Sequence, residues 1–143
     1  QIHSVEEMKD KTLGAQAGSS GYLDFEAQPD LLKNRVQDQK ANQYQSFNEA
    51  LIDLKNDRID ALLIDRVYAN YYLQSEGILN DYNVFSAGFE SESFAVGVRP
   101  ADKRLLTALN QAFIELYQEG KFQEISQKWF GEDVATKEVK SRD

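Results

Sequence analysis

The chain has 143 residues, 41% of them hydrophobic, and a net charge of −8 from 16 basic and 24 acidic side chains. This is the size of one ordinary domain, and the apolar content is enough for a real core, which argues against disorder. The acidic excess argues against a nucleic-acid partner, because phosphates require basic patches.

Cysteine is absent, which excludes disulfides, a thiol nucleophile and a thiolate metal site. No apolar run approaches the roughly 20 residues that span a bilayer. The chain begins Gln1-Ile2-His3, without a Met or an apolar signal segment, so we expect it to be part of a longer product.

The first predicted strand covers residues 12–17, after a polar lead-in of residues 1–11. A Gly-Ser-Ser-Gly turn at residues 18–21 separates it from a helix predicted over 22–27. A strand, a turn and a helix in this order direct backbone N–H groups toward an anion. Such tetrapeptides are also common connecting loops, and the residues alone favour that plain interpretation.

A further turn or two of helix is predicted within residues 31–39, and a weak polar strand over 41–45. A much clearer helix follows. Ser46 with Glu49 three residues later forms a capping box, which marks its start. Its apolar residues fall on one face, namely Phe47, Ala50, Leu51 and Leu54.

The central strand is predicted over residues 59–65, where five apolar residues indicate burial on both faces, as in parallel sheets. The strand ends at Asp65, and a helix over residues 66–75 begins at once. Ligands of open α/β sheets bind outside the carboxyl ends of strands, so Asp65 is placed to anchor a cation. It is also placed to cap the helix, and it can do both. Asp60 is expected to serve folding or hinge packing.

Two more strands are predicted over residues 82–87 and 93–99. The longest helix opens at residues 100–102 and closes at Gly120, and a short helix follows until Gly131. Both helices carry apolar stripes, formed by Leu105, Leu109, Ala112, Phe113 and Leu116 in the first and by Phe122, Ile125 and Trp129 in the second. In the helix predicted over residues 66–75, Tyr71 and Tyr72 are expected to pack against the sheet.

These segments, from about Thr12 to Gly131, resemble the solute-binding proteins of bacterial polar amino-acid ABC transporters in their order and spacing. Each segment is weak alone, but the ordered set is specific. The resemblance implies an α/β fold: a three-layer α/β/α lobe of a type II periplasmic-binding protein, with C-terminal helices that normally belong to the first lobe. The segments that carry it are residues 13–21, 46–54, 58–65, 94–99 and 120–131.

The resemblance also implies a domain division. After the lead-in, residues 12–90 would form the second ligand-binding lobe, residues 91–131 the hinge-return strand and C-terminal helices, and residues 132–143 a frayed tail. No residue here matches the family's first lobe, which normally supplies an arginine for the ligand carboxylate. Without that lobe the apolar stripes lack a partner. We expect the helices to fold back on the second lobe, or two chains to form a homodimer or exchange these helices.

In this family the second lobe holds a free amino acid by its two charged groups. By resemblance, Gly18, Ser19 and Ser20 would hydrogen-bond the α-carboxylate, and Asp65 would pair with the α-ammonium. No catalytic residue, metal or cofactor is implied. The side chain of the ligand stays open, with glutamine, cystine, histidine and basic amino acids as candidates.

The expected function is therefore that of an extracytoplasmic component of an amino-acid importer, which delivers a polar amino acid to an ABC transporter permease. It would lie in the periplasm, or at the cell surface as a lipoprotein or fused to the permease. One alternative is a ligand-sensing domain of a receptor or sensor kinase. Another is an enzyme of the same fold, such as a cyclohexadienyl dehydratase. The enzyme is disfavoured because no general acid or base beyond ordinary carboxylates is visible and the only histidine, His3, lies in the lead-in.

Overall fold

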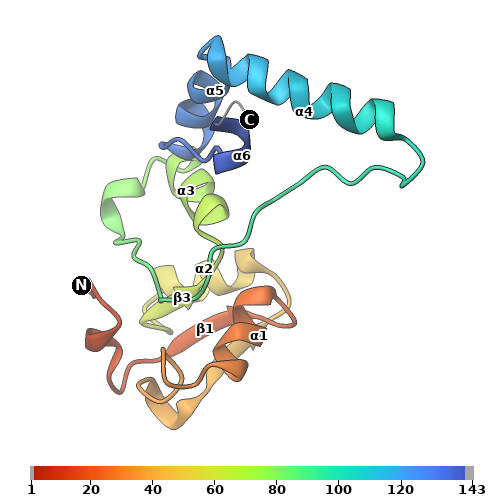
Figure 1. Cartoon of the computed structure of the whole chain (residues 1–143). Coiled ribbons are helices and arrows are strands. Elements are labelled where there is room, and N and C mark those ends of the chain that lie inside the picture. Colours follow the sequence, from red (N-terminus) through yellow and green to blue (C-terminus); the bar gives the residue numbers. More distant parts are fainter. Residues whose placement is uncertain (1, 141–143) are drawn as a thin grey trace. The chain divides into compact units, whose positions relative to one another are not determined.

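The computed structural model describes residues 2–140, which divide into two compact units (Figure 1). The first unit contains the residues up to 69 together with 78–90, and the second contains 70–77 together with the residues from 91 onward. Among the helices of the described chain, none combines the length and apolarity needed to cross a membrane.

The first unit is built on a parallel three-stranded sheet with the order β2-β1-β3. Its strands are β1 (Leu13–Gln16), β2 (Ala41–Tyr44) and β3 (Ala61–Leu63). Three of the five predicted strands and the α/β class are confirmed. However, β1 rather than the 59–65 segment lies at the centre, and all three residues of β3 are only half-buried. The expectation of a central strand buried on both faces is therefore wrong.

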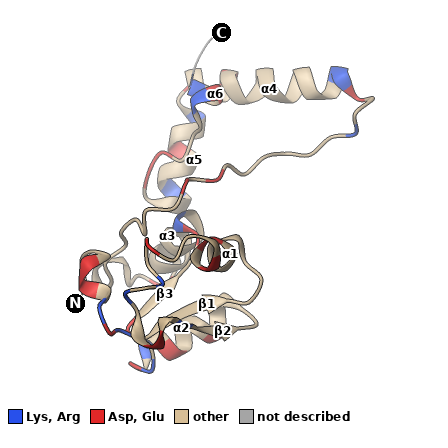
Figure 2. Ribbon diagram, turned by 60° about the horizontal axis from the view of Figure 1, so that its bottom comes forward, with Lys and Arg blue, Asp and Glu red and all other residues tan. Residues whose placement is uncertain are grey.

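Helices α1 (Ser20–Ala27) and α2 (Phe47–Lys55) lie on opposite faces of this sheet (Figure 2). On one face, Phe25 of α1 joins Leu13 in a buried cluster that also contains Met8, Leu32 and Val36. On the other face, the Tyr44 hydroxyl donates a hydrogen bond of 2.9 Å to Asp53 of α2. The polar lead-in contributes to this core, because it forms a 3-10 helix (Glu6–Met8) whose Met8 is 1% exposed.

The N-terminus of α2 is fixed by hydrogen bonds between residues that are close in the sequence. The Ser46 hydroxyl accepts a hydrogen bond of 3.3 Å from Glu49 N, which confirms the predicted cap. The Glu49 carboxylate accepts in return from Gln45 N at 3.2 Å, one residue earlier than the capping box predicts. The 31–39 region supplies a single short 3-10 helix (Gln37–Gln39).

Residues 82–99 form no strand, so both strands predicted there are wrong. A 3-10 helix (Leu79–Asp81) precedes them. Phe94 and Val96 are 77% and 56% exposed. The alternation of apolar residues reports strand propensity, but a strand also requires a neighbour for its backbone groups. Within residues 2–140, this segment pairs with no strand.

The second unit is helical. It holds the end of α3 (Arg66–Ser75), then α4 (Lys103–Gln118), α5 (Lys121–Phe130) and α6 (Lys137–Lys140). The predicted helices are confirmed, and Gly120 turns the chain between α4 and α5 with φ 78°. The two predicted apolar stripes meet at Phe113 and Phe122, whose ring centroids are 6.3 Å apart.

Two expectations for this unit are corrected. Tyr71 is 40% exposed, and its ring centroid lies 6.3 Å from that of Trp129, so it is not the core residue that its spacing indicates. The tail does not simply fray, since it contains α6. It is also tied back to α5, because the buried Ser126 hydroxyl donates to Glu132 O and accepts from Val134 N. Residues 141–143 lie outside the described residues.

Candidate ligand-binding site

The predicted site residues gather at the edge of the sheet where the strands end. Gly18, Ser19 and Ser20 follow β1, and Asp65 follows β3. Because β1 and β3 are parallel neighbours, with Ala15 opposite Leu63, their carboxyl ends meet at this edge. A Cβ added to Gly21 would lie 3.6 Å from Leu63 Cγ, so the first turn of α1 is next to the end of β3.

Ser19 is the N-cap of α1, and its polar groups are already used. Its hydroxyl accepts from Tyr22 N at 3.2 Å and donates to Gln16 O at 2.9 Å. Its N–H also donates to Gln16 O, at 3.2 Å. Gly18 has φ 70°, a left-handed conformation that suits glycine and turns the chain into the cap. Ser19 therefore shapes the turn, while its donors are directed at the protein.

The turn also holds backbone donors that have no protein partner. In the part of the chain that the structure describes, the N–H groups of Gly18, Ser20 and Gly21 donate to no acceptor. The first turn of a helix leaves groups such as those of Ser20 and Gly21 free, and they carry the positive end of the helix dipole. Ser20 is also exposed, and its hydroxyl adds a further donor. This arrangement can hold a carboxylate.

Gly21 is a candidate that sequence reasoning missed. The helix was predicted to start at Tyr22, whereas α1 begins at Ser20. This shift brings Gly21 into the first turn, where its N–H is unpaired. The signal was present in the sequence, because Ser19 is a good N-cap residue and caps are followed at once by the free N–H groups.

Asp65 is the N-cap of α3, as the sequence allowed. Its Oδ1 accepts from Tyr68 N at 2.8 Å, and its carbonyl accepts from Ala69 N at 2.9 Å. The residue is exposed, and within residues 2–140 its Oδ2 has no hydrogen-bond or ion-pair partner. One carboxylate oxygen can therefore accept from a cation while the other caps the helix.

Asp60 lies at the opposite edge of the sheet, where the strands begin. Its Oδ2 accepts from Thr12 Oγ1 at 2.6 Å and from Thr12 N at 2.8 Å. These hydrogen bonds hold the pKa of Asp60 below its ordinary value. Asp60 thus joins the starts of β1 and β3, and it belongs to the packing of the fold.

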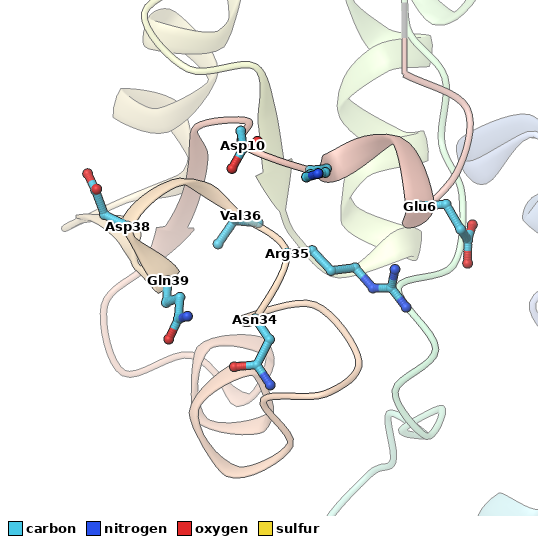
Figure 3. Close-up of a pocket in the computed structure, with 8 residues that line it drawn as sticks. Glu6, Asp10, Asn34, Arg35, Val36, Asp38 and Gln39 are labelled. Carbon is cyan, nitrogen blue, oxygen red and sulfur yellow. The ribbon is translucent and has the colours of Figure 1, made fainter.

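A polar surface pocket of ≈ 540 Å³ also lies at this opposite edge, where the chain leads into β1 and β2 (Figure 3). Cationic and anionic side chains both line it, among them Glu6, Lys9, Asp10 and Arg35. None of the predicted site residues contributes to its lining. The pocket is therefore separate from the carboxyl-end site.

Comparison with protein families gives a match over residues 34–132 to the bacterial extracellular solute-binding proteins, family 3. Among curated proteins, the chain is 29% identical over 133 residues to the L-cystine-binding protein TcyJ of Escherichia coli strain K12. That match covers 93% of the chain but 47% of the relative, so the chain spans about half the length of the curated relatives it matches.

Two solved structures are more similar. A polar amino acid ABC uptake transporter substrate binding protein from Streptococcus thermophilus is 62% identical, with a TM-score of 0.82, over 97% of this chain and 53% of that one. An ABC uptake transporter substrate binding protein from Streptococcus pneumoniae, solved with bound histidine, is 70% identical, with a TM-score of 0.76. The match covers 95% of this chain and 55% of the Streptococcus pneumoniae chain.

Proposed function

Because the chain belongs to family 3 of the bacterial extracellular solute-binding proteins, we propose that it binds a free polar amino acid for the permease of an ABC importer. The observation that carries this proposal is a pair of complementary groups at neighbouring strand ends. Free N–H donors of Ser20 and Gly21 follow β1, and a free carboxylate oxygen of Asp65 follows β3. A zwitterion needs one group of each kind.

In this proposal the α-carboxylate accepts hydrogen bonds from Ser20 N, Gly21 N and the Ser20 hydroxyl. The dipole of α1 adds a favourable interaction with the negative charge. The α-ammonium donates to Asp65 Oδ2, as a charge-assisted hydrogen bond. Ser19 acts through the shape of the turn, because its donors are used within the protein, whereas the unpaired N–H of Gly18 stays a candidate contact for the carboxylate.

Histidine is the first ligand to test, because the 70% identical Streptococcus pneumoniae protein was solved with histidine. Glutamine, cystine and the basic amino acids follow. The groups proposed here contact only atoms that all amino acids share. Selection among side chains would therefore depend on groups other than these.

The family consists of solute-binding proteins, which are not enzymes, and we propose no catalytic step for this chain. Its place would be extracytoplasmic, in the periplasm or at the cell surface. Residues 12–90 would act as one ligand-binding lobe, and closure of a second lobe over the amino acid would present the loaded form to the permease.

Titration calorimetry with the twenty amino acids and cystine tests the proposal, on the complete gene product and on the 143-residue chain. We expect one polar amino acid to bind the complete product, and Asp65→Asn to weaken that binding. Asp57→Asn is the matched control, because it makes the same change of charge at an exposed residue in the turn before β3. Failure of every amino acid to bind the complete product would refute the function.

A further inference from the structure

Gln16, the last residue of β1, is hydrogen-bonded to the candidate turn through its main chain. Its carbonyl accepts from both Ser19 N, at 3.2 Å, and Ser19 Oγ, at 2.9 Å. The same hydroxyl accepts from Tyr22 N at 3.2 Å. The Gln16 carbonyl therefore fixes the N-cap of α1, and with it the direction of the free N–H groups that follow.

The side chain of Gln16 makes a second connection, to the segment that follows β2. Its Nε2 donates to Gln45 O at 3.2 Å, just beyond the end of β2. Gln45 N in turn donates to the Glu49 carboxylate at 3.2 Å, within the cap of α2. The next residue of the turn, Ala17, donates from its N–H to Tyr44 O at 2.8 Å. Gln16 thus connects the start of α1 to the start of α2.

We propose that Gln16 is a positioning residue for recognition of the ligand carboxylate, an inference that rests on the proposed function. Gln16 does not touch the ligand; it acts through Ser19 on the N–H donors of Ser20 and Gly21. Preorganised donors are effective because they need no reorganisation when charge arrives, and a small misplacement weakens them. The side-chain hydrogen bond to Gln45 supplies that fixed placement.

The test compares two ligands on the complete gene product. One is the amino acid identified by titration, with histidine tried first, and the other is its carboxamide, which keeps the ammonium but lacks the carboxylate charge. Gln16→Met removes the hydrogen bond to Gln45 while keeping the length of the side chain. Gln43→Met is the matched control, because it removes a 3.1 Å hydrogen bond from β2 to the Tyr22 hydroxyl and leaves the turn untouched.

We expect the affinity ratio of amino acid to amide to fall about three- to tenfold in Gln16→Met, the range of one lost hydrogen bond, and to stay unchanged in Gln43→Met. A purely structural role would lower both affinities equally, and this result would overturn the inference. If Gln16→Met does not fold, Gln16→Ala serves in its place, because it removes the same hydrogen bond to Gln45 O without adding a charge and should lower the same ratio. A wild-type protein that binds no amino acid would overturn the proposed function itself.

Discussion

The Asp60 carboxylate accepts two hydrogen bonds from Thr12, one of 2.6 Å from the hydroxyl and one of 2.8 Å from the backbone N–H. Asp60 N donates back to Thr12 Oγ1 at 2.9 Å. The two residues are far apart in the sequence, yet they set β1 and β3 side by side at their first residues. The opposite ends of the same two strands then carry the turn at residues 18–21 and Asp65, the two groups that we propose bind the ligand.

Replacing Asp60 should destabilise the first unit. Asp60→Ala leaves the Thr12 N–H and hydroxyl without their acceptor, and we expect a loss of about 1 kcal/mol, since the pair is partly exposed to water. Urea unfolding measures the change. Asp57→Asn, in the neighbouring turn, is the control, because Asn tolerates the φ of 55° at this position and should leave the urea midpoint nearly unchanged. An equal loss in both variants would contradict this role.

The stability of the chain should fall in acid. The pKa of Asp60 lies below 3.8 because the Thr12 hydroxyl, and then the Thr12 N–H, stabilise its charged form. A carboxyl group of this kind adds stability above its unfolded pKa and loses it as the pH falls through the lower folded pKa. The unfolding midpoint should therefore be level above about pH 5 and decline below about pH 4. Asp60→Asn should reduce that decline, and an unchanged slope would argue against the assignment.

A side chain at Gly14 should strain the sheet. A Cβ there would lie 2.5 Å from Ile59 Cδ1 and 3.0 Å from the Tyr44 ring, and Ile59 is only 2% exposed. We expect Gly14→Ala to cost about 1–3 kcal/mol. Ile59→Val removes the obstructing methyl group, so the double variant should recover part of the loss in a mutant cycle. Gly97→Ala, which meets open space, is the control, and a Gly14→Ala variant as stable as Gly97→Ala would refute the prediction.

Ser19 allows the cap to be separated from the anion site. Ser19→Ala removes the acceptor for Tyr22 N and should cost about 1 kcal/mol of stability. Ser19→Asp keeps a capping acceptor for Tyr22 N but loses the hydroxyl donor to Gln16 O, so part of that stability should be retained. Its negative charge, however, stands beside the donors of Ser20 and Gly21 and should weaken amino-acid binding. Thermal unfolding and calorimetry measure the two effects, and full affinity in Ser19→Asp would argue that no carboxylate binds at this turn.

The sequence predicts best where local chemistry decides the structure. Ser46 caps α2 because a hydroxyl and a nearby N–H suffice to form the cap. Gly18 and Ser19 likewise form a turn whose cap is made by nearby residues, with the Ser19 hydroxyl between Gln16 O and Tyr22 N. The double role open to Asp65 was also foreseeable, because a strand end followed at once by a helix leaves one carboxylate oxygen for the cap.

Features that depend on a distant partner were not predictable in this way. The alternation of apolar and polar residues in 93–99 indicates a strand, but within the described chain this segment has no neighbouring strand to pair with. Tyr71 has helical spacing suited to a core, yet it contacts Trp129 of a helix that comes much later in the sequence. Gly21 was missed because α1 starts at Ser20, two residues before Tyr22, the first large side chain of the helix.

In the function proposed here, Ser20 N and Gly21 N donate to the ligand carboxylate, and Asp65 accepts from the ligand ammonium. Amide proton shifts of the isotope-labelled complete gene product, measured as the bound amino acid is added, test this most directly. We expect the Ser20 and Gly21 amide protons to move downfield on saturation with the amino acid, and far less with the carboxamide of that amino acid. Tight binding of the amino acid that leaves both resonances unchanged would show that its carboxylate does not bind at this turn.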